Sequence, residues 1–244
     1  VAHDADIKLA AEYALWSAMA NAGQSCIGAE RVYVVESVAD QFIETIVDMA
    51  KKIKPGQSYG PATMPSQLNV IQSHLDDAKA KGAKFLLGGP DSVKGAFVEP
   101  VIMVDVPEDS TAMTQETFGP TLAINKVMNT DEAIKLSNAS SYGLAAAVFS
   151  KREGEKIASK LACGMVSINS VFLFAAIAAV PFGGVKDSGY GRIHGAEGLL
   201  EYTYARSVVK TRFKIPLRFT TFKRTKLSEK ILTLLIKKLH GRKK

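Results

Sequence analysis

Short runs of apolar and β-branched residues alternate with helical patterns along the first two thirds of the chain. The helical patterns span about 4–21, 38–53, 65–81, 130–138 and 151–162, and the strand patterns 31–35, 84–87, 98–104, 122–127, 144–150 and 165–169. Apolar strands separated by helices are typical of a parallel sheet that is covered on both faces. We therefore expect an α/β fold with three αβα layers and a mostly parallel sheet.

The composition and the two cysteines are typical of a globular domain without a disulfide framework. Of the 244 residues, 47% are hydrophobic and 23% are charged, as in ordinary globular domains. No apolar run reaches about 18 residues, which argues against a membrane-spanning helix. The first residues lack the pattern of a signal peptide, and we expect Val1 to follow a cut inside a longer protein. Because Cys26 and Cys163 lie far apart, we expect no disulfide and a cytoplasmic location.

Cys26 is the first candidate for chemistry, in the segment Asn21–Glu30. Gly23 and Gly28 flank it and let the backbone approach a bound group closely. A thiol with a pKa of about 8.5 is only a few per cent ionised at neutral pH, so a nucleophile needs an activating group nearby. No histidine is adjacent in sequence. A small buried hydrophobe is the alternative for a lone cysteine, and local chemistry leaves the two open.

Four sequence blocks, which follow one another along the chain, favour the nucleophile over the buried hydrophobe for Cys26. They are Gly23-Gln-Ser-Cys26, Gln115-Glu-Thr-Phe-Gly-Pro120, Tyr142-Gly-Leu144 with Val148-Phe149, and Pro181-Phe-Gly-Gly-Val-Lys-Asp-Ser-Gly-Tyr-Gly-Arg192. Together they resemble the aldehyde dehydrogenase superfamily from residue 21 to about 209. The resemblance implies the catalytic domain of that family, with Cys26 as the nucleophile.

The resemblance also implies a reaction. The Cys26 thiolate adds to a small-molecule aldehyde to give a thiohemiacetal, a hydride leaves for the nicotinamide of NAD or NADP, and water hydrolyses the thioester to a carboxylic acid. The Cys26 main-chain N–H is expected to donate to the developing oxyanion. We expect no metal. The choice between NAD and NADP, between water and coenzyme A as acceptor, and among aldehydes stays open, although the apolar segment 172–180 favours aliphatic or aromatic substrates.

Four further residues receive roles from the resemblance. Glu116 is expected to accept hydrogen bonds from the nicotinamide ribose, and Phe118 to lie beside the nicotinamide. Asn169 is expected to shape the site near the cysteine loop, and Phe182 to line the substrate entrance. The alternatives are a solvated carboxylate for Glu116, a core aromatic for Phe118 and a tight structural loop for 181–192.

We expect three regions: a catalytic cysteine domain over 1–205, an oligomerisation strand over 206–216 and a basic amphipathic tail over 217–244. The alternating segment 202–210 is expected to form a strand that pairs with a neighbouring subunit, so the full-length protein is expected to be a homo-oligomer. No Gly-rich phosphate loop follows an N-terminal strand. Relatives keep the coenzyme-binding domain, the general-base glutamate and an oxyanion asparagine upstream, so we expect this chain to be inactive alone.

The net positive charge of the chain comes from its C-terminal tail. Residues 210–244 hold 13 of the 31 Lys and Arg residues and one acidic residue, Glu229. The segment 225–239 has helical apolar spacing, and at about 22 Å it is too short to cross a ~30 Å hydrocarbon core. This helix could contact an anionic membrane peripherally, or it could pack on the body of the protein or on a partner; both alternatives stay open. They suggest an interaction module as the alternative function. Few aromatics interleave the basic residues, so we expect no nucleic-acid binding.

Overall fold

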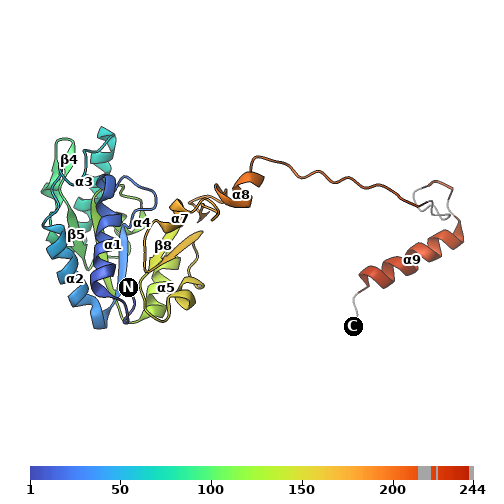
Figure 1. Ribbon diagram of the computed structural model, residues 1–244, viewed down its shortest axis with the longest axis horizontal. Helices are drawn as coiled ribbons and strands as arrows, with labels where there is room; N and C mark the ends of the chain where they lie inside the picture. Colours follow the sequence, from blue (N-terminus) through green and yellow to red (C-terminus); the bar gives the residue numbers. More distant parts are fainter. Residues whose placement is uncertain (214–220, 224, 242–244) are drawn as a thin grey trace. The chain divides into compact units, whose positions relative to one another are not determined.

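The computed structural model describes residues 1–213, 221–223 and 225–241 (Figure 1). The chain divides into two compact units, Val1–Thr203 and Tyr204–Lys244. The boundaries expected at 205 and 216 stay predictions, and residues 214–220, on which the second boundary falls, lie outside the described residues. None of the helices in the described part of the chain combines the length and hydropathy that a bilayer crossing requires.

The central sheet of the first unit has four strands in the order β1-β6-β5-β2. They are β1 (Arg31–Val35), β6 (Thr121–Val127), β5 (Val101–Val104) and β2 (Lys84–Leu87). β1 and β5 both run parallel to β6, while β2 is an antiparallel edge strand beside β5. The expectation of a mostly parallel sheet is confirmed.

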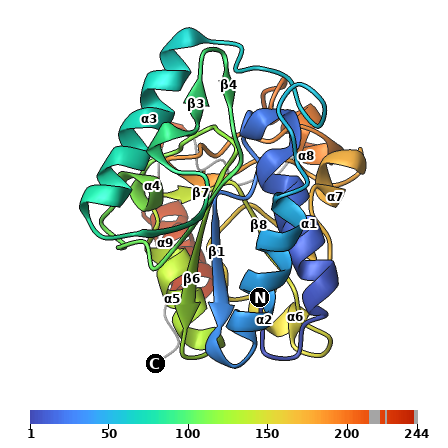
Figure 2. The same ribbon diagram turned by 90° about the vertical axis from the view of Figure 1, so that its left-hand side faces the viewer.

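Helices cover both faces of this sheet, which confirms the three-layer αβα arrangement (Figure 2). α1 (Ile7–Met19) and α2 (Glu36–Ala50) pack on one face, against Ile102 and Ile124. α3 (Pro65–Ala80) and α4 (Thr111–Thr114) pack on the other, against the next residues along the same strands. The alternation arises because successive strand side chains point to opposite faces.

A second, two-stranded parallel sheet pairs β8 (Ala145–Val148) with β9 (Met165–Ile168), separately from the four-stranded sheet. The remaining elements of this unit are η1 (Ala20–Gly23), η2 (Pro90–Ser92), β3 (Val93–Lys94), β4 (Phe97–Val98), α5 (Thr130–Ala139), β7 (Tyr142–Gly143), α6 (Gly154–Ala158), α7 (Leu173–Ala176), β10 (Val185–Lys186) and α8 (Gly195–Leu200). The second unit contains α9 (Lys226–His240).

Three expected elements differ from the structure. The strand expected over 98–104 is divided into β4 and β5, because Pro100 between them has no N–H to donate. The helix expected over 151–162 is reduced to α6, since Ser150 Oγ accepts from the N–H groups of Arg152 and Glu153 and holds that stretch as a turn. The strand expected over 202–210 does not form within one chain, where residues 204–210 have no main-chain partner among the described residues.

Candidate active site

Cys26 lies in an exposed turn between η1 and β1. The backbone reaches this turn through three consecutive left-handed residues, Asn21 (φ 54°), Ala22 (φ 58°) and Gly23 (φ 71°). The side chains of Asn21 and Gln24 stabilise the bend, because each donates to the other's main-chain carbonyl at 2.9 Å. The cysteine is therefore presented to solvent, as expected of a nucleophile rather than of a core residue.

The side chain of Gln24 also fixes the turn from outside. Its Oε1 atom accepts from Thr63 N at 2.8 Å and from Thr63 Oγ1 at 2.9 Å, and its Nε2 atom donates to Pro61 O at 3.3 Å. Behind the turn, Ala29 N donates to Ser17 Oγ on α1 at 3.0 Å. The cysteine turn is thus tied to α1 on one side and to the 61–63 segment on the other.

Gly23 brings the cysteine turn against the segment that carries Glu116. A Cβ atom at position 23 would lie 2.0 Å from the carbonyl oxygen of Gly119, a distance that no real side chain shows. A residue with a side chain would separate these two backbone segments. The glycine is required here both for its left-handed φ and for this approach.

The turn that follows Glu116 is held by polar side chains from elsewhere in the sequence. The carboxylate of Glu30 accepts from Thr117 N at 3.0 Å and from Phe118 N at 2.8 Å. Gln67 Nε2 donates to Thr117 O at 2.6 Å, and His74 Nδ1 lies 3.0 Å from Thr117 Oγ1. Burial lowers the pKa of His74, which favours the neutral ring in this contact.

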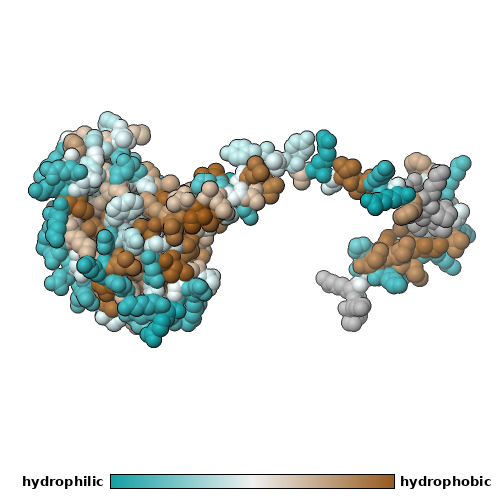
Figure 3. Space-filling view, in the orientation of Figure 1, coloured by the Kyte–Doolittle hydropathy of each residue, from teal (hydrophilic) through white to brown (hydrophobic). Residues whose placement is uncertain are grey.

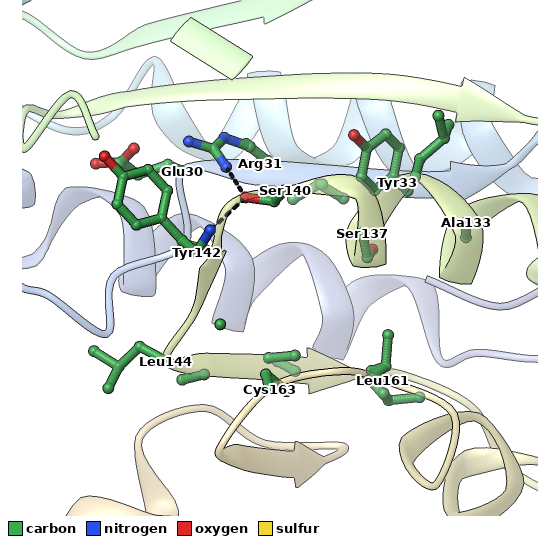
Figure 4. A pocket seen from close by; sticks show the side chains of 18 of the residues that line it. Glu30, Arg31, Tyr33, Ala133, Ser137, Ser140, Tyr142, Leu144, Leu161 and Cys163 are labelled. Carbon is green, nitrogen blue, oxygen red and sulfur yellow. Dashed lines mark hydrogen bonds between the residues drawn. The ribbon is translucent and has the colours of Figure 1, made fainter. Parts of the chain in front are cut away.

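Arg31 connects the same segment to the start of β7. Its guanidinium donates to Gln115 O at 2.8 Å and to Ser140 Oγ at 3.2 Å, and lies 5.9 Å from the centre of the Tyr142 ring (Figure 4). The buried Nε of Arg31 has no hydrogen-bond partner among the described residues. Arg31 is thus a cation fixed between two backbone segments that border the site.

Glu116 itself is exposed, and its carboxylate accepts no hydrogen bond from the described residues. Partial desolvation raises the pKa of Glu116, the negative charge of Glu30 raises it further, and the positive charge of Arg31 opposes both. A free carboxylate in this position fits the hydroxyl groups of a nicotinamide ribose, which would supply the donors that the chain does not.

Cys26 and Glu116 line one cavity of about 640 Å³. Residues of β1, α5 and β8 form part of its wall, so the cavity lies between an edge of the four-stranded sheet and the two-stranded sheet. Cys163 also lines it, half-buried, with its thiol donating to Met165 O at 3.3 Å. Burial raises the pKa of Cys163, which disfavours the thiolate and distinguishes it from exposed Cys26.

The other three expected site residues do not line this cavity. The Asn169 amide bonds the Ser150 main chain in both directions, donating to its carbonyl at 2.8 Å and accepting from its N–H at 3.0 Å. Asn169 therefore joins the ends of β8 and β9. Phe182 pairs with Ile193 and packs against Phe174, whose ring centroid is 6.3 Å away. The roles expected for these residues stay predictions.

Phe118 is half-buried, with a left-handed backbone (φ 52°) fixed by its bond to Glu30. Its role beside the nicotinamide also stays a prediction. Sequence reasoning missed Glu30 and Arg31 as supports of the site. The available signal was a pair of opposite charges directly before and at the start of an apolar strand, where charged side chains need partners.

The chain is similar to a known protein family and to several of its members. Residues 1–208 match the model of the aldehyde dehydrogenase family. The chain is 39% identical over 219 residues to a 4,4'-diapolycopene aldehyde oxidase of Methylomonas sp, covering 87% of this chain and 41% of that protein. It is 40% identical over 214 residues to a putative succinate-semialdehyde dehydrogenase [NADP(+)] of Mycobacterium ulcerans (strain Agy99), covering 83% and 41%.

A solved structure is similar as well. The betaine aldehyde dehydrogenase of Staphylococcus aureus, in complex with NAD+, superposes with a TM-score of 0.76 at 37% identity, over 82% of this chain and 42% of that one. The chain therefore spans less than half the length of the relatives it matches. The match over residues 1–208, together with the four ordered motifs, identifies the chain as a member of the aldehyde dehydrogenase family.

Proposed function

We propose that the protein to which this chain belongs oxidises an aldehyde to a carboxylic acid with NAD or NADP, using Cys26 as the nucleophile. One observation carries the proposal: exposed Cys26 and the unpaired carboxylate of Glu116 border the same cavity. They come from segments about ninety residues apart, which the Gly23–Gly119 contact brings together.

In the proposed reaction, Cys26 Sγ loses its proton and attacks the carbonyl carbon to give a thiohemiacetal. The chemistry that a bound nicotinamide cofactor would supply is acceptance of a hydride from that carbon; as the hydroxyl proton of the adduct passes to water, the adduct would become a Cys26 thioester. Water adds to the thioester carbon, the C–S bond breaks, and the acid and the thiol are released. Because Cys26 alternates between free thiol and thioester, one difficult oxidation is divided into two easier steps.

The cofactor contact that we assign to this chain is Glu116. Its carboxylate has no donor among the described residues, and two ribose hydroxyls would supply donors of the required kind. Of the relatives, one is named for NADP+ and another was solved with NAD+. These names support a nicotinamide dinucleotide as the cofactor of this protein. The choice between NAD and NADP is left to experiment.

An aldehyde with an apolar chain is the substrate class that we infer. Exposed Trp16 on α1 lies edge-on to Phe172, with ring centroids 5.2 Å apart, and Phe172 lines the cavity that contains Cys26. Apolar binding surfaces of this kind retain apolar groups because water is released from both partners. Leu173, which is half-exposed beside Phe172, extends the apolar surface.

We also propose that the full-length protein is a cytoplasmic homo-oligomer. The segment that follows α8 supports this, because Tyr204, Val208 and Val209 are at least 80% exposed and their main-chain groups have no partner among the described residues. Such a segment is suited to pairing with a strand of a second copy. The absence of a disulfide between Cys26 and Cys163 is compatible with a reducing compartment.

A chimera tests the activity. Residues 1–208 of this chain replace the matching segment of the Mycobacterium ulcerans relative, so that both halves of a full-length protein are present. A panel of short and long aliphatic, aromatic and carboxylated aldehydes is then assayed with NAD+ and NADP+ by absorbance at the reduced-nicotinamide band. We expect acid production that Cys26→Ala abolishes. A folded chimera without activity, or an active Cys26→Ala variant, rejects the proposal.

A further inference from the structure

The helix α9 (Lys226–His240) has two chemically different sides. At about 100° per residue, its seven leucine and isoleucine residues occupy one broad arc, whereas Lys226, Lys230 and Lys237 fall in a narrow stripe on the opposite side. In Figure 3, hydrophobic residues gather along one side of this helix. We call the two sides the apolar face (Leu227, Ile231, Leu232, Leu234, Leu235, Ile236 and Leu239) and the lysine stripe (Lys226, Lys230 and Lys237).

Local interactions complete both ends of α9. Thr225 Oγ1 accepts from Ser228 N at 3.2 Å while Ser228 Oγ accepts from Thr225 N at 3.0 Å, which forms a capping box. Glu229 lies in the first turn, and Lys237 and Lys238 lie in the last. These charges interact favourably with the helix dipole and stabilise the helix at both ends. The helix is therefore specified by its own sequence.

Within the described part of its own unit, the apolar face is uncovered. No residue of α9 is buried, and Leu227, Leu234 and Leu239 are each at least 65% exposed. Soluble monomers rarely leave a continuous apolar surface of this kind in water, so the face is expected to meet a partner.

We propose that α9 docks this protein on the surface of an anionic lipid membrane, with the apolar face in the acyl-chain boundary and the lysine stripe toward the headgroups and water. The charge of the helix supports this partner, because four lysines stand against one glutamate. Each lysine near an anionic surface strengthens binding roughly fivefold. At about 22 Å the helix lies on the membrane rather than crossing it.

The position of Lys238 favours lipid over a second copy of the helix. Lys238 lies within the arc of the apolar face, between Leu227 and Ile231 on the helical wheel. Pairing two copies through this face would bury both ammonium groups, whereas at a membrane the side chain extends to the headgroups. Phe222, three residues before the N-cap Thr225, is fully exposed and adds an aromatic side chain to the exposed apolar residues of this unit.

The test is co-sedimentation of the 244-residue chain with vesicles of phosphatidylcholine alone and of phosphatidylcholine with about 30% phosphatidylserine. Two variants form a matched pair, since each adds one negative charge to α9. Leu235→Glu places it at the centre of the apolar face, and Thr233→Glu places it on the polar side beside the lysine stripe. Circular dichroism checks that both keep the helix.

We expect binding to the anionic vesicles that weakens with salt and is at least tenfold stronger than binding to phosphatidylcholine alone. Thr233→Glu should weaken it roughly fivefold, as one unit of charge predicts, and Leu235→Glu should weaken it at least tenfold more. Replacing the three lysines of the stripe by glutamine should reduce it roughly a hundredfold. Equal binding to both vesicle types, or equal effects of the matched pair, overturns the proposal. So does self-association that Leu235→Glu abolishes in a chain that binds no vesicles.

Discussion

The carboxylate of Glu30 accepts a hydrogen bond from the main-chain N–H of Phe118 at 2.8 Å, across 88 residues of sequence. A second bond, from Thr117 N, makes Glu30 a clamp on the turn that follows Glu116. Glu30 stands four residues after Cys26. The clamp therefore couples the two candidate active-site segments directly.

Replacing Glu30 should loosen this turn. Glu30→Ala leaves two main-chain N–H groups without their charged acceptor and is expected to destabilise the chain by about 2 kcal/mol. Glu30→Gln keeps an oxygen acceptor and should have less than half that effect. Urea unfolding monitored by circular dichroism measures both. Equal stability of wild type and Glu30→Ala would show that water replaces the carboxylate.

Gly23→Ala should separate the cysteine turn from the Glu116 segment. The new Cβ would meet the carbonyl oxygen of Gly119, and the residue would keep a left-handed φ of 71°. Strain and overpacking together predict a loss of about 3 kcal/mol. Gly95→Ala is the matched control, because Gly95 has φ 62° and a Cβ added there would meet nothing within 4 Å. It should lose about 1 kcal/mol in the same unfolding assay.

The two cysteines should differ in reactivity. Cys26 is exposed, while Cys163 is half-buried, donates its thiol to Met165 O and has its pKa raised by burial. With limiting iodoacetamide at pH 8, we expect Cys26 to be alkylated at least tenfold faster, as followed by peptide mass spectrometry. Comparable rates at both positions would contradict the difference in environment between the two thiols.

Glu116→Gln should affect function more than stability. The pKa of Glu116 is raised by desolvation and by the charge of Glu30, so its ionised form is disfavoured in the folded state. A carboxylate with a raised pKa stabilises the fold more below that pKa than above it, and removing the charge should leave stability at pH 7 unchanged or slightly higher. In the chimera, the same variant should raise the KM for the cofactor about tenfold, which steady-state kinetics measures. A large loss of stability would instead indicate a structural role.

Acid sensitivity should depend on Asp77. Its carboxylate accepts from Thr111 N at 2.7 Å and from Ser110 Oγ at 2.8 Å, and these bonds lower the pKa of Asp77 to about 2. The stabilisation is present above the unfolded-state pKa and is lost as pH falls from about 4 toward 2. Urea midpoints at pH 7, 4 and 2.5 should therefore fall less in Asp77→Asn than in wild type. If the urea midpoints of both proteins fall equally between pH 7 and pH 2.5, other carboxylates dominate the loss of stability in acid.

Much of the fold was predictable because it follows from local patterns. The strands at 31–35 and 122–127 are confirmed as β1 and β6, with bounds within one residue, since each is a short apolar run between polar turns. The helix over 65–81 is confirmed as α3, where Pro65 begins the first turn. Ser37 and Thr130 are of residue types common at helix N-caps, but they lie inside α2 and α5. Val35 and Asn129 occupy the cap positions.

The features that local sequence patterns could not predict depend on contacts between residues that are distant in the sequence. The alternation over 202–210 satisfies the spacing of a strand, but a strand forms only where a second one supplies its hydrogen bonds. The engagement of Asn169 with Ser150 has the same origin, because it requires β8 and β9 to lie side by side. Cys26 could be selected from its sequence block, whereas its support by Glu30 needed the register of the folded sheet.

The pairing of β1 with β6 joins Arg31 to Ala123 in a parallel register. A ribosome must therefore add about a hundred residues after the nucleophile before that strand can pair with its neighbour, and contacts of such long range form slowly. During this interval the thiol at position 26 is exposed to oxidants without its final surroundings. Pulsed alkylation of stalled nascent chains should find that sulfur accessible at every length and its turn protected from protease only after residue 127 has left the exit tunnel.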